Sequence, residues 1–377
     1  MTVRVSKPEF NLREKLSELD KPTGVKGLDL MGSDTTQDAR SFISAGRKNY
    51  IINGDFQVSQ RGDYTSATTA SNQAYYLDRW TVDASGVGAT IQHKTNQLVG
   101  NSSGDYYKNT VTMAATSSAT GYLQLRQKME LHKSLFGKTV TVSAWVKSNH
   151  PNIRLRTEGG WYGSGNNWDS LQSHNGDGRW QKLSMTIRLK SNPSYLVFGI
   201  ILWGSTGGPP ANHAQAAIKS GDYYEFTDFQ VEIGENATDF EHRTFAEEYE
   251  LCQRYFQSNF PVGVPPQNGY YSTTQKLAAG FNGAVSFSSN NARSPWVMFH
   301  PKMRVEPDVT LYAASNDDTD NKWAAYKGSW NSDAGNPIDK FGSNGFGVRF
   351  NSASGSHAFV VGEAYLYRGM WAADAEL

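Results

Sequence analysis

The sequence is poor in the features that would place it in several large protein classes. It has a single cysteine, Cys252, so no disulfide can form within the chain. Lysine plus arginine and aspartate plus glutamate number 36 each. The resulting net charge of zero argues against a nucleic-acid partner, because phosphate binding normally needs a basic surplus. The longest apolar run, residues 195–203, is too short to span a bilayer, so no membrane insertion is expected.

Targeting and catalytic motifs are missing as well. Arg4 and Lys7 lead into an acidic, amphipathic stretch rather than the apolar core of a signal peptide, so we expect synthesis in the cytoplasm without secretory export. No nucleophile elbow, His-Glu-x-x-His helix or phosphate-binding loop occurs, and no two histidines have the spacing of metal ligands. We therefore expect no enzymatic activity. A carboxylate pair that cleaves glycosidic bonds stays open as an alternative, because Asp and Glu are numerous.

What is abundant points to an all-β protein. Aromatic residues make up 12% of the chain, charged residues only 19%, and there are 36 glycines, a mixture typical of many turns and aromatic-rich loops. Several segments alternate apolar and polar residues, the pattern of a strand with one buried face. They are 50–62, 138–147, 179–189 and 223–234. The stretch from the first to the last of these segments has the length of one domain, so we expect the two segments to close a single β-sandwich.

Residues 1–48 differ from the rest of the chain. Leu12, Leu16 and Leu19 fall on one stripe of a predicted helix, and a second short helix follows. Two short helices cannot bury a core alone. The arm therefore either packs on its own sandwich or docks on another protein or on copies of itself, and we favour docking.

A helix and a second β region follow the expected sandwich. Residues 245–256 carry apolar side chains at helical spacing, after a capping box of Thr244 and Glu247. Strand patterns return at 277–288, 296–299, 307–312 and 357–367. The sequence thus predicts four parts: a helical attachment arm (1–48), a β-sandwich of the jelly-roll type (49–243), a linker helix (244–260) and a smaller, sandwich-like C-terminal β domain (261–377).

Several motifs resemble those of bacteriophage tail and head fibre proteins. The segment 10–20 is similar to an N-terminal segment that attaches such fibres to the particle. The other motifs are Tyr50-Ile51-Ile52-Asn53-Gly54-Asp55-Phe56 with Gln60-Arg61-Gly62, Tyr76-Leu77-Asp78-Arg79-Trp80, Phe226-Thr227-Asp228-Phe229-Gln230-Val231-Glu232 with Leu251-Cys252-Gln253-Arg254-Tyr255, and the end of the chain from Trp371 to Leu377.

The resemblance implies a receptor-binding fibre of the virion. It implies a jelly roll similar to carbohydrate-binding modules, assembly as a homotrimer, and contact with other virion proteins through residues 1–48. The side chains that would make this attachment are Phe10, Leu12, Leu16 and Leu19.

The resemblance also implies a structural calcium ion between the first and last strands of the jelly roll, held by oxygen ligands. The matching positions are Asp55, Gln57 and Asp228. A common pattern in such jelly rolls has a glutamate after the phenylalanine of the first strand. Gln57 stands there in this chain, which removes one negative charge and weakens the expectation of a metal.

Sugar rings bind to aromatic faces, with nearby polar groups reading the hydroxyls. A Gly- and Asn-rich stretch and a strand end supply such rings, and the candidate glycan-binding residues are Trp161, Tyr162, Trp168, His174 and Trp203. The alternative is that these side chains cover the core or a subunit interface. Trp80, Trp145 and Trp180 lie within strand patterns and are assigned to the core.

The leading hypothesis is therefore a structural fibre of a phage particle that binds a glycan of the host surface through its β domains. Two alternatives remain open, a tailspike that degrades polysaccharide and a purely architectural fibre without a ligand.

Overall fold

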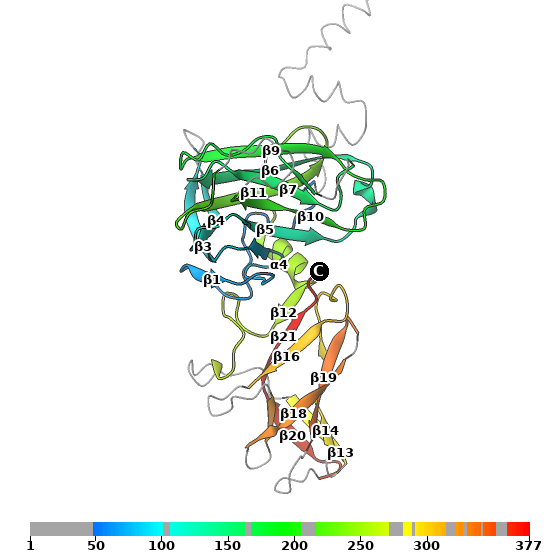
Figure 1. The fold of residues 1–377 in the computed structure, drawn as a ribbon. Coiled ribbons are helices and arrows are strands. Elements are labelled where there is room, and N and C mark those ends of the chain that lie inside the picture. Colours follow the sequence, from blue (N-terminus) through cyan, green and yellow to red (C-terminus); the bar gives the residue numbers. More distant parts are fainter. Residues whose placement is uncertain are drawn as a thin grey trace, which may run out of the picture. The chain divides into compact units, whose positions relative to one another are not determined.

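The structure is a computed structural model that describes residues 48–100, 106–162, 167–204, 216–270, 282–288, 291–313, 322–326, 330–340, 342–351 and 360–377. The chain divides into two compact units, Met1–Lys48 and Asn49–Leu377. The predicted arm and its attachment residues Phe10, Leu12, Leu16 and Leu19 lie outside the described residues. The second unit is built mainly of antiparallel strands, which confirms the predicted all-β class (Figure 1).

Two antiparallel sheets form the predicted sandwich, and the chain passes repeatedly from one sheet to the other. The six-stranded sheet has the order β1-β3-β4-β11-β6-β9 and the five-stranded sheet the order β2-β5-β10-β7-β8. In chain order the strands are β1 (Thr68–Ala70), β2 (Thr81–Ser85), β3 (Ala89–Val99), β4 (Tyr106–Ala115), β5 (Tyr122–Met129), β6 (Thr139–Ser148), β7 (Ile153–Glu158), β8 (Asn167–Asp169), β9 (Trp180–Arg188), β10 (Leu196–Trp203) and β11 (Tyr223–Ile233).

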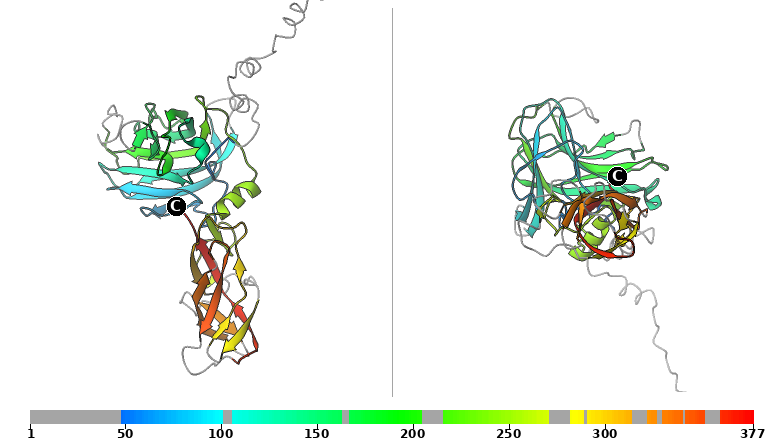
Figure 2. Two further views of the ribbon diagram at one scale, coloured as in Figure 1. Left: turned by 90° about the vertical axis from the view of Figure 1, so that its right-hand side faces the viewer. Right: turned by 90° about the horizontal axis from the view of Figure 1, so that it is seen from below.

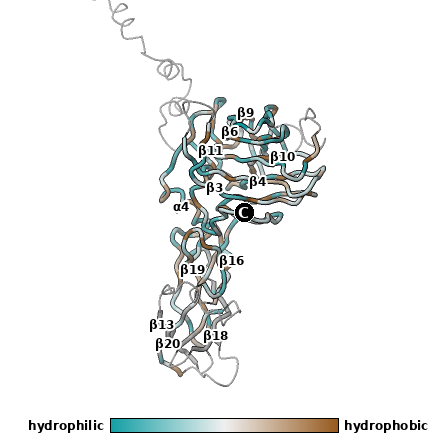
Figure 3. The backbone as a smooth tube through the Cα atoms, turned by 90° about the vertical axis from the view of Figure 1, so that its left-hand side faces the viewer, coloured by the Kyte–Doolittle hydropathy of each residue, from teal (hydrophilic) through white to brown (hydrophobic). Residues whose placement is uncertain are grey.

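The alternation of side chains along each strand fills the space between the sheets. On β6 the core-facing side chains are Val140, Val142, Ala144 and Val146. Their neighbours point to the other face of the same sheet, because successive strand residues alternate. Figure 3 shows hydrophobic and hydrophilic segments interleaved along the sandwich strands.

The predicted strand over 50–62 is not a strand in the structure. Asn53 and Phe56 have φ angles of 57° and 56°, in the left-handed region, which interrupts extended backbone. The segment still lies beside β11, since the Tyr50 amide donates to the Val231 carbonyl and the Phe229 amide to the Gly54 carbonyl, both at 2.9 Å. The two ends of the sandwich therefore meet as predicted, although one of them is a loop.

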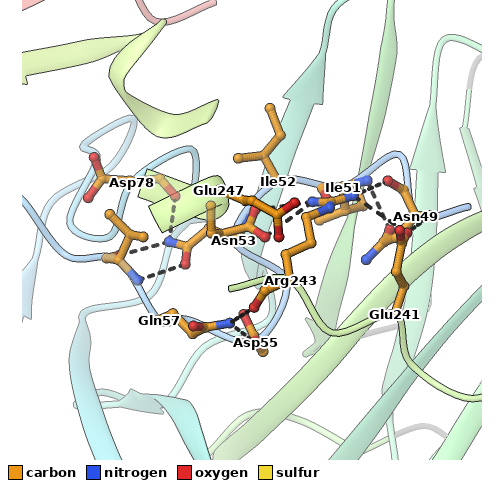
Figure 4. Close-up of polar contacts among 12 residues, drawn as sticks. Asn49, Ile51, Ile52, Asn53, Asp55, Gln57, Asp78, Glu241, Arg243 and Glu247 are labelled. Atoms are coloured by element: carbon orange, nitrogen blue, oxygen red, sulfur yellow. Dashed lines mark hydrogen bonds and ion pairs between the residues drawn. The ribbon is translucent and has the colours of Figure 1, made fainter. Parts of the chain in front are cut away.

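Asn53 is the centre of this loop (Figure 4). Its side-chain amide donates to the carbonyls of Val58 and Asp78 at 2.8 and 3.1 Å, and its side-chain oxygen accepts from the Val58 amide at 3.0 Å. Its backbone amide donates to Glu248 of the following helix, and its carbonyl accepts from the Trp80 indole at 2.9 Å. One buried residue thus ties the first loop, through its side chain and its backbone, to the sandwich core and the helix.

The linker helix is α4 (Phe245–Gln253), slightly shorter than the predicted 245–256. Thr244 and Glu247 form the predicted capping box, in which each side chain accepts from the other residue's backbone amide. The chain leaves the helix directly into β12 (Phe256–Ser258). No helix within the described ranges has the length and apolar character needed to cross a membrane.

The C-terminal part contains a three-stranded sheet, β12-β21-β16, and a larger sheet of order β14-β13-β20-β17-β18-β19-β15. An additional pairing of β14 with β19 closes the larger sheet into a ring of six strands, so this predicted sandwich-like domain is in detail a narrow barrel (Figure 2). The strands are β13 (Asn282–Ser288), β14 (Asn291–Arg293), β15 (Val297–Met298), β16 (Asp308–Tyr312), β17 (Trp323–Tyr326), β18 (Trp330–Lys340), β19 (Gly345–Asn351), β20 (Ala364–Arg368) and β21 (Met370–Asp374).

Buried charges join the end of the chain to the sandwich. Arg79, 1% exposed, contacts the carboxylate of Glu376, and its guanidinium lies 3.4 Å from the centre of the Tyr255 ring. Arg61 reaches Asp374 at 2.8 Å and Glu376 at 3.3 Å. We call these four charged residues the junction cluster. It unites the Gln60-Arg61-Gly62, Asp78-Arg79-Trp80 and C-terminal motifs that were separate in the sequence.

Candidate functional site

The outer face of the six-stranded sheet carries a tryptophan among polar side chains. The β6 residues on this face are Thr139, Thr141, Ser143, Trp145 and Lys147, opposite in phase to the core valines. Trp145 pairs across the sheet with Thr227 of β11 and Lys182 of β9, and its side chain is only partly buried. The assignment of Trp145 to the core was therefore wrong.

Trp145 lies in a cleft of about 650 Å³ over this face. The floor includes Ser143, Trp145 and Asp228. Tyr106 and Tyr107, at the start of β4, line another part of it and are 66% and 75% exposed. The other lining residues are Val99, Gly100, Lys108, Lys182, Thr238, Asp239, Phe240 and His242.

The loop after β11 forms one wall of the cleft and is fastened to the sheet. The Thr238 amide and hydroxyl donate to the two carboxylate oxygens of Glu232, at 2.9 and 2.6 Å. The Glu241 amide donates to the side-chain oxygen of Gln230 at 2.8 Å, and Lys182 donates to the Thr238 carbonyl at 3.1 Å. These hydrogen bonds hold the wall in place in the absence of a ligand.

The chemistry of the cleft suits a polyhydroxylated, uncharged ligand. Aromatic rings offer faces for stacking, while hydroxyl, carboxylate and ammonium groups can exchange hydrogen bonds with ligand hydroxyls. Two lysines, Lys108 and Lys182, are matched by two carboxylates, Asp228 and Asp239. With Lys108 already paired to Asp228, the cleft shows no surplus of either charge.

Trp180 was also assigned to the core, and it is buried as predicted, although not between the two sheets. It lies on the same outer face, paired with Lys147, and it does not belong to the buried cluster between the sheets. Its indole is 6% exposed because it packs beneath the β3 strand end and donates to the Leu98 carbonyl at 3.0 Å. Trp80, by contrast, is fully buried in the core as predicted.

The aromatic stretch favoured from the sequence lies elsewhere, at the edge of the five-stranded sheet. Trp161 and Trp168 stack on each other with ring centres 4.4 Å apart, and both pack against the sandwich core. Tyr162 is 63% exposed, with the Arg188 guanidinium 5.1 Å from its ring centre. Residues 163–166 between them lie outside the described residues. None of these three rings lines the cleft.

His174 and Trp203 are held by the protein itself, which does not support the predicted role in ligand binding. His174 is buried, and its two ring nitrogens contact the backbone of Gly176 and Arg179 at 2.9 Å. Trp203 is also buried, and its indole donates to Asp169 at 2.6 Å. Neither ring is available to a sugar in this arrangement.

The three positions expected to hold calcium do come together, but the donor set does not fit. Gln57 presents its amide nitrogen, not its oxygen, to Asp55 at 2.6 Å and to the Arg243 carbonyl at 3.1 Å (Figure 4). Lys108 contacts Asp228 with its ammonium group. No cluster of three or more His, Cys, Asp or Glu side chains arranged for a metal ion is found in the described part of the chain. A divalent ion would have to displace an ammonium group that is already in place.

Comparisons with known proteins place carbohydrate-binding modules among the similar structures. No protein-family model matches the chain, and no curated protein matches it. TmCBM61, solved with β-1,4-galactotriose, is 14% identical with a TM-score of 0.30, over 50% of this chain and 100% of that chain. The CBM22-1-GH10 modules of Clostridium thermocellum xylanase 10B, solved with xylohexaose, are 13% identical with a TM-score of 0.30, over 52% and 30%.

A phage protein is among the similar structures too. The enzymatically active domain of tailspike protein 4 from bacteriophage CBA120 is 9% identical with a TM-score of 0.31. The match covers 49% of this chain and 21% of that chain, so about half of this chain corresponds to about a fifth of the tailspike chain. Identities and TM-scores this low do not assign the chain to a family.

Proposed function

We propose that the chain binds a neutral glycan in the cleft over β11, β6 and β9. The observation that carries the proposal is the placement of Trp145 on the polar phase of its strand, partly exposed at the floor of a preformed cleft. A sugar ring stacked on this indole would have Ser143 and Thr238 within the same cleft to meet its hydroxyls. Tyr106 and Tyr107 would extend the aromatic surface to a second sugar unit.

The charged groups in the cleft favour binding of the glycan without its cleavage. Hydrolysis of a glycosidic bond normally uses two carboxylates, one kept protonated as the acid and one left free as nucleophile or base. The cleft carboxylate on the sheet, Asp228, is instead ion-paired with Lys108. Incubation of the protein with host envelope polysaccharide should release no reducing ends, and a steady release over time would favour the enzyme.

Substitution of Trp145 by alanine tests the proposed site. We expect glycan-array binding by the Trp145→Ala variant to fall at least about tenfold, because truncation of a central aromatic anchor commonly costs about 2 kcal/mol or more. The fold should survive, since Trp145 lies outside the core between the sheets.

Trp168→Ala is the matched control, because Trp168 is an equally large and partly buried ring on the other sheet. It should leave array binding unchanged. If binding is lost in Trp168→Ala and kept in Trp145→Ala, the glycan site lies at the sandwich edge instead. If no glycan is bound by the unchanged protein, the architectural fibre is favoured.

We propose in addition that the chain is a fibre component of a bacteriophage virion, made in the host cytoplasm and present as a trimer. The support is the motif resemblance, and the arm of residues 1–48 is the proposed attachment to other virion proteins. Several copies on one particle would raise a modest affinity per site through effective concentration.

Deletion of residues 1–48 tests the proposed attachment. The shortened chain corresponds to the compact unit Asn49–Leu377, so we expect soluble protein that still binds glycan. It should no longer join particles in a complementation assay, measured by immunoblot of purified virions. Normal incorporation of the shortened chain would refute attachment through the arm and leave the glycan site untouched.

A further inference from the structure

The buried carboxylates of Asp55 and Asp228 need a positive charge near them. Asp55 is 7% exposed and Asp228 is 5% exposed. One oxygen of each, Oδ1, is buried without a hydrogen-bond partner. Burial raises the pKa of Asp55, and the nearby charge of Asp228 raises it further, so the two carboxylates are close enough to repel each other.

The backbone fixes Asp228 in this position. The β11 ladder to β6 is irregular between Thr227 and Gln230, and Asp228 within this bulge has a φ of 53°. A bulge redirects a side chain that would otherwise follow the alternation of the strand. Asp228 is thereby directed toward the cleft floor and Asp55, instead of following Tyr224 and Phe226 into the core.

Lys108 supplies the charge. It lies on β4, opposite Gln97 of β3, and its side chain is 13% exposed where its ammonium group contacts Asp228 Oδ2. The side-chain N–H of Gln57 donates a hydrogen bond to Asp55 Oδ2. The two carboxylates are therefore contacted by donor groups of the protein's own side chains. His242 also lies close to Asp55.

We propose that Lys108 is a built-in counter-ion of Asp228 that takes the place of a divalent cation beside Asp228 and its neighbour Asp55. The fold and the neighbouring cleft then need no calcium. Because Asp55 Oδ1 and Asp228 Oδ1 are buried and unpaired, removal of the ammonium group should leave a latent oxygen site that a divalent cation can enter. The inference does not depend on which ligand, if any, the cleft binds.

Thermal unfolding of the full chain with excess EDTA and with millimolar CaCl₂ tests the proposal. The unchanged protein should have the same midpoint in both. The Lys108→Met variant should unfold roughly 5–10 °C lower in EDTA, because the buried Asp228 carboxylate loses its counter-ion beside a second buried carboxylate, and calcium should recover part of that loss. Magnesium should recover less, since it demands a stricter octahedral geometry.

Two further variants keep the test decisive. Lys182→Met removes the other cleft lysine, whose ammonium group donates to a carbonyl rather than a carboxylate, and it should show no calcium response. Lys108→Met combined with Asp228→Asn removes both charges, so it should fold even if the single variant does not, and without a calcium response. A lower midpoint of the unchanged protein in EDTA would overturn the proposal. So would a Lys108→Met variant that folds with an unchanged midpoint and ignores calcium.

Discussion

The Arg79→Ala variant is expected to lose about 3–5 kcal/mol of unfolding free energy. Arg79 is buried in the junction cluster, where it contacts Glu376 and stacks on Tyr255. It also donates to the Lys128 carbonyl at 2.6 Å. Truncation leaves the buried Glu376 carboxylate with Arg61 at 3.3 Å and the backbone amide of residue 79 at 3.2 Å. Loss of one of two charged partners from a buried carboxylate costs far more than the loss of an exposed pair.

Urea unfolding followed by tryptophan fluorescence measures this loss. Arg254→Ala is the matched control, because Arg254 and Glu130 form an ion pair in which both side chains are 42% exposed. That control should lose no more than about 1 kcal/mol. If Arg79→Ala unfolds with the same midpoint as Arg254→Ala, the junction cluster contributes little to stability. A split into two unfolding transitions would show that the cluster also couples the sandwich to the C-terminal barrel.

Trp80→Ala should be comparably damaging, with a loss of about 3–5 kcal/mol. Trp80 is fully buried, and its ring centre lies 5.3–5.5 Å from those of Phe56, Phe226 and Phe229. Its indole also donates to the Asn53 carbonyl at 2.9 Å. The substitution therefore opens a large cavity and removes a hydrogen bond that holds the first loop.

The Trp80→Phe variant separates these two contributions. It keeps most of the buried ring and loses the indole N–H, so we expect a smaller loss, of about 1–3 kcal/mol. Both values come from chemical unfolding monitored by far-ultraviolet circular dichroism. Equal losses in the two variants would mean that the hydrogen bond to Asn53, not the aromatic cluster, dominates at this position.

The sequence predicted the overall β architecture better than the positions of individual strands. Strands with clean alternation, such as β6 and β9, were found within one or two residues. The segment 50–62 was misassigned because Asn53 and Phe56 adopt left-handed backbone, which the alternation of residue types cannot reveal. Strand β18 was missed because it contains Gly335 and Pro337, residues that usually argue against a strand. Its ladder to β19 is irregular between Gly335 and Ile338.

The candidate site was misplaced for a different reason. The aromatic cluster at 161–168 was preferred because glycines surround it, whereas Trp145 was assigned to the core because it lies in a strong strand. The necessary signal was present in the phase of that strand, since Trp145 alternates with Ala144 and Val146 and shares the parity of Thr141 and Ser143. The cleft itself depends on the loop after β11 folding back over the sheet, and no local pattern encodes that contact.

The pairing of β14 with β19 has a consequence for molecules held close together. An open sheet edge presents unpaired amides and carbonyls to which a strand of a neighbouring chain can add, the usual start of edge-to-edge aggregation. In the described strands of the barrel the hydrogen-bonded circuit is complete, with β15 pairing further along the same edge of β19 that β14 occupies. Many copies can therefore be concentrated in a small volume while the backbone hydrogen bonds of each barrel stay within that barrel.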